Sequence, residues 1–225
     1  MTQFTTKLKA WTKNWSGTIV FVFLLFAFRS VVADWYQVPT GSMKPTIIEG
    51  DRIFVNKLAY DIKVPFTLIS LVKWDHPHRG DVVVFDSPTG GPRLVKRVAG
   101  LPGDIVMIRN NELFINGKPA HYETTDQSGV AKYWDSSKTA PVLISESFEE
   151  QPPHTITIQP FRHFIARNYG PIEVPAKHYF MLGDNRDNSA DSRFIGPINE
   201  KYILGKANAV VLSLSHLDRY FLRLN

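Results

Sequence analysis

Two residues in this sequence, Lys96 and Ser42, could together cleave an acyl bond. Lys96 lies in the apolar run 94–98. If this run is a β-strand, side chains alternate between its faces, so Lys96 shares one face with Leu94 and Val98. Burial among apolar side chains favours the neutral amine form of a lysine. A neutral lysine can act as a general base and take the proton of a nucleophilic hydroxyl group.

Ser42 is the candidate for that hydroxyl. It lies in the turn-like segment 39–46, Pro-Thr-Gly-Ser-Met-Lys-Pro-Thr, shortly after an apolar N-terminal segment. Taken alone, a serine between Gly and Met is usually a turn residue, and a lone lysine usually reaches solvent. The prediction of a catalytic pair therefore depends on both residues together. A serine nucleophile, a lysine base and a membrane anchor suggest a protease at a membrane surface.

Composition excludes several other classes of protein. The chain has 225 residues, a formal net charge of +5 and no cysteine. The length allows one domain or two modest ones. The absence of cysteine excludes disulfides, thiolate metal sites and a cysteine nucleophile. Basic residues are scattered, and the chain has neither a zinc ribbon nor a helix-turn-helix pattern, so we expect no nucleic-acid partner.

The first 33 residues carry the features of a membrane anchor. Residues 1–16 contain lysines and no acidic residue, and residues 17–28 are almost entirely apolar. We expect one transmembrane helix over 17–33, about 25 Å long at the helical rise, with Arg29 reaching the headgroups. Basic residues before the span favour a cytoplasmic N-terminus over 1–16. The alternative is a signal peptide cleaved near residue 33, which a charged residue inside the apolar stretch disfavours.

Beyond the anchor the pattern predicts a mainly β fold. Short β-branched runs are bounded by Gly, Pro and Asp, and the stretch Glu112–Ile115 followed by Asn116-Gly117 predicts a hairpin with a two-residue turn. We expect a catalytic β domain from 34–105 and 177–216, an inserted smaller β subdomain over 106–176 and a tail over 217–225. Residues 118–155 are polar and are expected to be loops or a peripheral part of that subdomain. The strongest predicted strands are 52–55, 81–85, 94–98, 105–108, 179–182 and 209–212.

Four segments, in order, resemble the conserved boxes of bacterial type I signal peptidases. They are Gly41-Ser42-Met43-Lys44-Pro45-Thr46, Gly80-Asp81-Val82-Val83-Val84-Phe85, Lys96-Arg97-Val98-Ala99-Gly100-Leu101-Pro102-Gly103-Asp104 and Gly183-Asp184-Asn185-Arg186-Asp187-Asn188-Ser189-Ala190-Asp191-Ser192-Arg193. The resemblance runs from the anchor to about Gly205 and weakens between Asn110 and Lys177. Some members have two N-terminal membrane spans, whereas this sequence has room for one.

The resemblance implies a role for each residue of the site. Ser42 would attack the scissile carbonyl, and Lys96 would take its proton and later deliver it to the leaving amine. The Ser42 amide and the Thr40 hydroxyl would hold the oxyanion. Three further residues would support the site: Ser189 would form a hydrogen bond with the lysine and orient it, and Asp191 and Arg193 would form a charged pair that holds this box in place.

The resemblance also implies the substrate, namely signal peptides of exported preproteins with small residues one and three positions before the cut (Ala-x-Ala). An extended peptide would pair with strands beside Ser42. The implied pocket residues are Tyr36, Val38, Pro39, Met43, Ile47, Leu94 and Val95, although each could equally serve core packing. The enzyme would lie on the outer, periplasmic face of the bacterial cytoplasmic membrane, in contact with the lipid bilayer and close to the export translocon.

A second apolar segment, residues 64–74, contains Pro65 and ends at Trp74. It has no clean strand alternation, so it could enter the membrane interface or form a buried hairpin.

Other readings of the sequence are weaker. Asp75, His76 and His78 invite a Ser-His-Asp triad, but the chain has no G-x-S-x-G elbow. His76 and His78 could chelate a metal, but spacing places no third ligand, so we expect neither a metal nor an organic cofactor. The alternatives for function are a specialised relative that matures one dedicated substrate, an inactive membrane-anchored binding module and a self-cleaving DNA-binding repressor. The last would need an N-terminal helix-turn-helix where this sequence has an apolar segment.

Overall fold

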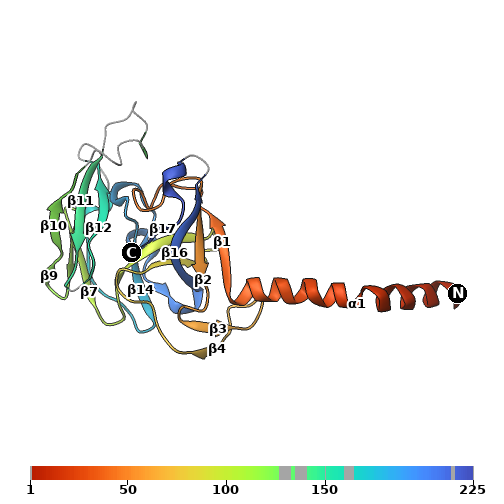
Figure 1. Ribbon diagram of the computed structural model, residues 1–225. Helices are drawn as coiled ribbons and strands as arrows, with labels where there is room; N and C mark the ends of the chain where they lie inside the picture. The colour runs from red at the N-terminus through yellow and green to blue at the C-terminus, as the bar shows by residue number, and fades with distance from the viewer. Residues whose placement is uncertain are drawn as a thin grey trace.

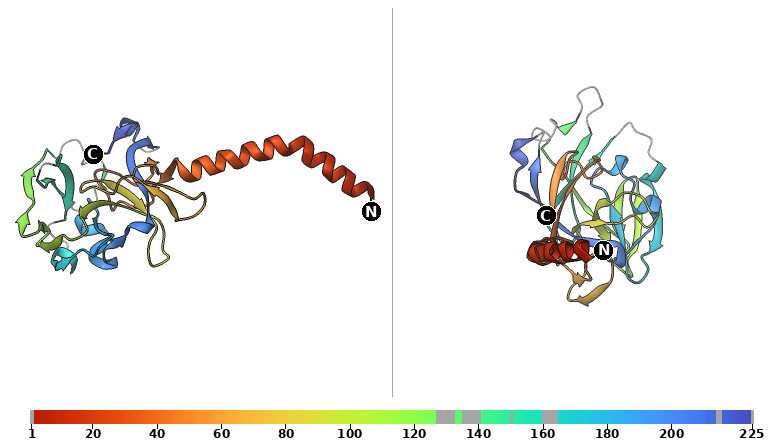
Figure 2. Two further views of the ribbon diagram at one scale, coloured as in Figure 1. Left: turned by 90° about the horizontal axis from the view of Figure 1, so that it is seen from below. Right: turned by 90° about the vertical axis from the view of Figure 1, so that its right-hand side faces the viewer.

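The structure, a computed structural model, describes residues 2–126, 133–134, 141–149, 151–159, 165–213 and 216–224. A long N-terminal helix leads into a body of antiparallel sheets and extends away from it (Figures 1 and 2). The expected mainly β fold is therefore confirmed. Within the stretch 118–155, where loops or a peripheral part of the subdomain were expected, residues 127–132, 135–140 and 150 lie outside the described residues.

The largest sheet has eight strands in the order β1-β2-β16-β5-β6-β14-β15, and β17 pairs with β16. Its strands are β1 (Ala33–Gln37), β2 (Asp51–Asn56), β5 (Val82–Phe85), β6 (Leu94–Gly100), β14 (His178–Leu182), β15 (Ile198–Asn199), β16 (Ile203–Ser213) and β17 (Leu222–Arg223). The six strongest predicted strands are all present, five of them in this sheet and 105–108 in a smaller one. The expected tail is partly structured, because β17 pairs with β16 and Leu224 is buried in the core.

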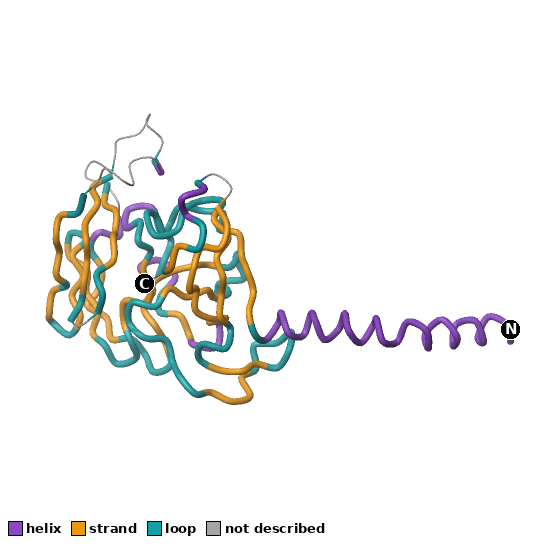
Figure 3. The backbone as a smooth tube through the Cα atoms, in the orientation of Figure 1, coloured by secondary structure: helices purple, strands orange, loops and turns teal. Residues whose placement is uncertain are grey.

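The segment between β6 and β14 forms two smaller sheets (Figure 3). One sheet has the order β13-β7-β8-β9 and the other the order β10-β11-β12. Asn116 and Gly117 both have positive φ, as a two-residue hairpin turn requires, so the predicted hairpin is confirmed. These strands are β7 (Ile105–Arg109), β8 (Glu112–Ile115), β9 (Lys118–Pro119), β10 (His121–Thr124), β11 (Val142–Ser147), β12 (His154–Ile158) and β13 (Tyr169–Glu173).

Residues 61–73 form a separate two-stranded hairpin of β3 (Asp61–Lys63) and β4 (Ser70–Lys73), near the body end of the long helix (Figure 1). Its apolar side chains face solvent, with Phe66, Ile69 and Leu71 each 63–64% exposed. A hairpin is therefore present in the segment 64–74, but it is exposed rather than buried.

The N-terminal helix α1 (Thr2–Val31) is longer than the predicted 17–33 segment, because it begins well before residue 17. Among the described residues, no helix is both long and apolar enough to span a bilayer, so the predicted transmembrane helix is not confirmed. Arg29 interrupts the apolar run, and its Nε donates a hydrogen bond of 2.8 Å to Asp34 Oδ1 at the junction with β1.

The short helices of the body are η2 (Ile165–Arg167), η3 (Arg186–Asn188), α2 (Ser192–Ile195), η4 (Glu200–Tyr202) and η5 (Leu217–Arg219).

Core packing follows the alternation of side chains along β5 and β6. Val82, Val84 and Val95 belong to the cluster that also contains Met43 and Ile47. The alternate residues of the same two strands lie on the other face, in a second cluster. They are Val83, Phe85, Leu94 and Val98. A third cluster joins β6 and β14 to the inserted sheets through Ala99, Phe180 and Leu182. The central strands β5, β6 and β14 are thus packed on both faces, which makes them a rigid platform for side chains that carry chemistry.

Candidate active site

Strand β6 holds Lys96 in the interior. Its neighbour across the β5–β6 ladder is Val83, and Leu94 and Val98 lie in the same cluster as Val83, as the predicted alternation requires. The side chain is long and charged, yet the residue is only 2% exposed. A lysine is almost never buried this completely unless it is paired or functional.

The turn between β1 and β2 carries Ser42, and the box 183–193 fixes this turn from the other side. The Asn185 amide donates to the Ser42 carbonyl at 3.0 Å. The Asn185 side chain donates to the Gly41 carbonyl at 2.9 Å. Met43, the next residue, is fully buried in the core. The serine is therefore held on both sides, although it belongs to no regular element.

The two predicted catalytic residues meet. Lys96 Nζ donates a hydrogen bond of 2.7 Å to Ser42 Oγ and a second of 2.9 Å to the Val95 carbonyl. Ser42 is 8% exposed, so the contact is largely shielded from water. Nucleophile and base within hydrogen-bond reach, separated by 54 residues in the chain, form the arrangement that serine activation needs.

Burial lowers the pKa of Lys96 to about 8. The negative charges of Asp191 and Asp184 oppose this effect and favour the ammonium form, whereas Arg193 adds to it. Desolvation outweighs the two carboxylates because both are themselves neutralised by arginines. The amine is therefore partly neutral in mildly alkaline solution, as a general base must be.

Asp191 and Arg193 form the predicted charged pair. Arg193 Nε donates to Asp191 Oδ1 at 2.8 Å, and both side chains are fully buried. The other carboxylate oxygen accepts from the Gly183 amide at 3.0 Å. Arg193 also donates to the Arg186 carbonyl at 2.7 Å. This pair thus links Gly183, directly after β14, to Arg186 and to the last residues of the box 183–193.

Ser189 lies close to the dyad without the predicted hydrogen bond to Lys96. Its Oγ is buried and has no hydrogen-bond partner among the described residues. A methyl group placed on Gly183 would lie 2.2 Å from this Oγ and 2.5 Å from the Ser42 carbonyl. The serine therefore packs against the Gly183 backbone, and only glycine leaves room for both neighbours.

Asp184 and Arg97 form a second buried ion pair, to which sequence reasoning gave no role. Arg97 donates to both carboxylate oxygens of Asp184, at 2.9 Å and 2.8 Å. Thr46, from the serine turn, donates to the same carboxylate at 2.5 Å. Burial alone would raise the pKa of Asp184, but the Arg97 charge outweighs burial and lowers it. Both residues lie in the quoted boxes, so the motif was visible but the pairing was not.

Glu146, on β11, connects the inserted sheets to the same box and carried no motif at all. Its carboxylate forms a bidentate pair with Arg186, with distances of 2.9 Å and 2.5 Å. It also accepts from the Tyr122 hydroxyl at 2.8 Å. The stretch 118–155 as a whole is rich in polar residues, and that composition predicted loops or a peripheral part of the subdomain. Because the pair is buried, the inserted sheet helps to hold the box 183–193.

The predicted substrate-pocket residues lie in three different places. Val38, Met43 and Ile47 are buried in one core cluster, against which Tyr36 and Val95 pack. Leu94 packs on the opposite face, and Pro39 and Thr40 are exposed beside Ser42. Tyr36 also lines an open cleft of ≈ 470 Å³ together with Arg93 and Phe66. Their assignment to substrate and oxyanion binding stays a prediction.

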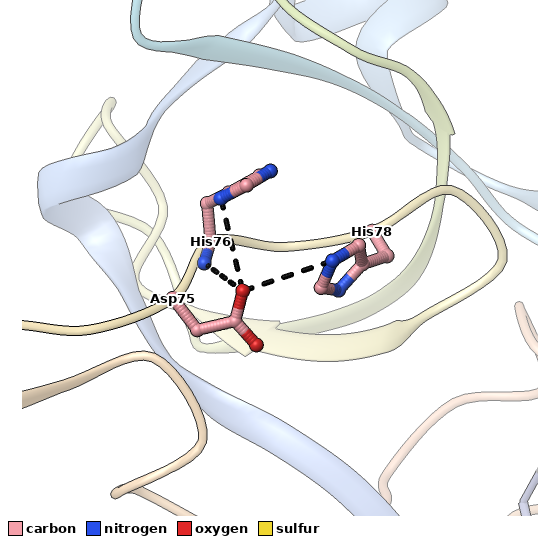
Figure 4. Close-up of side chains that lie close together, drawn as sticks. All are labelled: Asp75, His76 and His78. Carbon is pink, nitrogen blue, oxygen red and sulfur yellow. Dashed lines mark hydrogen bonds and ion pairs between the residues drawn. The ribbon is translucent and has the colours of Figure 1, made fainter.

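Among the described residues, no histidine is hydrogen-bonded to Ser42. Ser42 Oγ accepts from Lys96, whereas the His76 and His78 side chains are 61% and 58% exposed and face Asp75 (Figure 4). The dyad geometry therefore favours lysine over histidine as the base.

Burial of Lys96 gives a prediction for stability. Its pKa is about 8 in the folded protein and 10.5 as the ordinary value, so between these pH values the unfolded chain binds more protons. Stability should rise with pH across this window. Below pH 8 the full cost of a buried ammonium is present, about 3 kcal/mol. We expect Lys96→Met to be more stable than the native chain at pH 7, by up to about that amount, and this gain to shrink towards pH 10.5.

Urea unfolding of both proteins between pH 7 and 10.5 measures this difference, with the exposed Lys118→Met as control. A gain that does not change with pH would mean that Lys96 titrates normally.

The known proteins that this chain resembles are signal peptidases. The family described as "Signal peptidase, peptidase S26" matches residues 11–212. A signal peptidase I of Pseudomonas fluorescens is 36% identical over 219 residues, covering 88% of this chain and 73% of its own length. That of Pseudomonas aeruginosa is 36% identical over 210 residues, covering 85% and 69%. A crystal structure of a signal peptidase I from Enterococcus faecalis is 31% identical and covers 59% of this chain and 97% of its own, with a TM-score of 0.35.

Proposed function

Because the chain belongs to the signal peptidase family of peptidase S26 and is a serine endopeptidase, we propose that it removes signal peptides from exported preproteins with Ser42 as nucleophile and Lys96 as base. The observation that carries the proposal is the buried 2.7 Å hydrogen bond between Lys96 Nζ and Ser42 Oγ. The names of the relatives support the substrate class.

The proposed reaction has two halves. In the first, the neutral Lys96 amine takes the proton of Ser42 as Oγ bonds to the scissile carbonyl carbon. The resulting ammonium then gives this proton to the leaving amine as the C–N bond breaks, which leaves an ester on Ser42. In the second half, Lys96 takes a proton from water, hydroxide attacks the ester and Ser42 Oγ leaves with the proton. Lys96 ends as it began.

Two groups beside the nucleophile are suited to hold the oxyanion. The Ser42 amide belongs to the nucleophile itself, and the Thr40 hydroxyl lies at the exposed start of the same turn. Loss of one such donor costs roughly 10²–10³ in rate in other hydrolases. Ser189 would act on the base rather than on the oxyanion. Its Oγ is buried and has no hydrogen-bond partner among the described residues, so rotation of the side chain could bring it to the Lys96 amine.

Small residues before the cut would be selected by shape. Val95 is half-buried next to Lys96 and packs against the same core cluster as Tyr36, which borders the cleft beside the exposed hairpin. An extended peptide could add to the strands here through backbone hydrogen bonds, with side chains limited to those that fit. Substrates with a large residue immediately before the cut should therefore fail.

An apolar surface supports attachment to a lipid bilayer. From Ile19 to Phe28, the large apolar side chains of α1 are mostly exposed, and so are Phe66, Ile69, Leu71 and Trp74 of the hairpin region. The two parts touch: the Phe66 amide donates to Ser30 Oγ at 2.8 Å, and the Phe66 and Phe23 rings are 6.5 Å apart. Such a surface is unfavourable in water and matches the membrane interface. We propose that it holds the enzyme on the outer face of the cytoplasmic membrane, where its substrates and the translocon lie.

Purified full-length protein in detergent tests the function with a preprotein that carries an Ala-x-Ala site. We expect mass spectrometry to show one cut after the second alanine, and no cut when that alanine is replaced by phenylalanine or when Ser42 is alanine. Several unrelated preproteins should be cut. Cleavage of one preprotein alone would indicate the specialised relative, and no cleavage of any would support the inactive binding module.

Deletion of residues 1–28 should separate attachment from catalysis. This deletion leaves Ser30, β1 and both dyad residues in place. We expect little change in kcat/KM on a short Ala-x-Ala peptide, and a loss of roughly 10²-fold on preproteins in vesicles, because a shared surface raises effective concentration. Parallel kinetics on the two substrates measure the difference.

The protein without residues 1–28 should still bind vesicles through the hairpin of β3 and β4. Replacing Ile69 and Leu71 by serine should abolish flotation with vesicles, whereas Leu217→Ser, 72% exposed elsewhere on the body, should not. For the deletion of residues 1–28, equal losses of kcat/KM on peptide and preprotein would instead mean that α1 supports the structure of the catalytic body.

A further inference from the structure

The loop between β4 and β5 brings three potential metal ligands together. Asp75 Oδ1 lies 3.7 Å from His76 Nδ1 and 3.7 Å from His78 Nε2. One ligand atom from each of the three residues lies within 4.8 Å of the others. Figure 4 shows the Asp75 carboxylate between the two imidazole rings. Sequence spacing had offered the two histidines alone, and the fold adds the carboxylate.

Hydrogen bonds at both ends hold the loop in this shape. At its start, the amides of Trp74 and Asp75 both donate to the Tyr60 carbonyl at 3.1 Å. At its end, the His78 amide donates to Asp81 Oδ2 at 3.0 Å. Between them Pro77 has a fixed φ. The backbone that carries the ligands is thus fixed before any ion binds, which reduces the entropy lost on binding.

Asp81 anchors the end of the loop through the His78 amide. It is buried, accepts from the Tyr60 hydroxyl at 2.7 Å and pairs with Lys206 Nζ at 2.5 Å. Its Oδ2 is also 3.9 Å from His78 Nδ1, so the opposite ring nitrogen, Nε2, faces Asp75. At 3.9 Å this contact is longer than a hydrogen bond, so Asp81 contributes negative charge behind the His78 ring rather than a bond to it.

The donor set selects a class of ion. Two imidazole nitrogens and one carboxylate oxygen suit Zn²⁺ or Cu²⁺, whereas Mg²⁺ and Ca²⁺ require mostly oxygen ligands. Around a tetrahedral ion with bonds of ~2.1 Å, ligand atoms lie ~3.4 Å apart. The two distances from Asp75 to the histidines, 3.7 Å each, are a few tenths of an ångström longer, and all three ligand atoms lie within 4.8 Å of one another. The Asp75 oxygen accepts the His76 amide at 2.8 Å but keeps capacity for an ion.

We propose that Asp75, His76 and His78 form a surface site for one divalent transition-metal ion, Zn²⁺ or Cu²⁺, with water completing the coordination. The ligands are exposed at the surface, so an ion can enter directly from solvent. The site takes no part in the Ser42–Lys96 reaction, so chelators should leave peptide cleavage unchanged.

Calorimetric titration of the full chain in detergent with ZnCl₂ tests the proposal. The protein must carry no histidine tag and must first be stripped with a chelator. We expect one Zn²⁺ per chain, and a loss of affinity of at least ~10-fold in each of His76→Ala, His78→Ala and Asp75→Asn, because even outer-shell changes cost 10–100-fold. His121→Ala is the matched control, since His121 is an exposed histidine beside a single carboxylate, that of Glu123; it should bind as the native chain does.

Electron paramagnetic resonance with Cu²⁺ gives a second readout on the native chain. Two equivalent nitrogen couplings are expected, and one in His76→Ala. The proposal is overturned if the native chain binds no Zn²⁺, or if the double variant His76→Ala/His78→Ala binds it within threefold of the native affinity. Because binding is measured rather than activity, failure of the protease proposal would leave this result unaffected.

Discussion

Ser42→Ala, Lys96→Ala and the double variant are expected to lose similar factors in kcat/KM, each at least about 10³-fold. The reason is that Oγ and Nζ, 2.7 Å apart, act as one unit: once the base or the nucleophile is gone, the other has no remaining role. Lys96→Arg should be as inactive as Lys96→Ala, because a guanidinium group stays protonated in proteins. Kinetics on a short Ala-x-Ala peptide in detergent measure all four.

Two controls separate chemistry from folding. Circular dichroism should show native secondary structure in each variant, and the exposed Lys118→Ala should keep full activity. Additive losses in the double variant, or substantial activity in Lys96→Ala, would point to a different base.

Asp191→Ala should destabilise the folded protein by about 3–5 kcal/mol, because it removes the carboxylate that balances the charge of a buried guanidinium. Arg193 and Asp191 are fully buried, and the same carboxylate also accepts from the Gly183 amide. A loss of this size is a large part of the stability of an ordinary domain. Urea unfolding at pH 7 measures it.

Replacement of both partners tests the reason for that loss. Asp191→Ala combined with Arg193→Leu should be less destabilised than Asp191→Ala alone, since the stranded charge is gone. Glu149→Ala, which breaks the exposed pair with Lys118, should change stability by less than about 1 kcal/mol. A double variant at least as unstable as the single one would mean that the aspartate acts mainly through its contact with the Gly183 backbone.

The parts of the fold that sequence predicted are those with local signals. Alternation of apolar side chains located the central strands, and Asn116-Gly117 located a hairpin turn. The meeting of Ser42 and Lys96 was also predicted, although not from geometry: it depended on ordered boxes whose joint pattern is specific.

The parts that sequence missed depend on contacts between distant segments. Glu146 reaches Arg186 across 40 residues, and a polar stretch gives no sign that one acid in it is buried. Thr46 and Asp184 are 138 residues apart. The sequence also could not decide whether the region around Phe66 is buried or exposed, because apolar side chains are typical both of a core and of a membrane interface.

The pH dependence of kcat/KM on a short peptide tests the central claim, that a buried neutral lysine is the base. The account predicts a rise through an apparent pKa near 8, unchanged by EDTA. In Asp191→Asn the midpoint should move to lower pH, because the carboxylate that favours the ammonium form is gone. A profile that already rises near pH 6.5, the ordinary range of histidine, with no shift in Asp191→Asn, would contradict it.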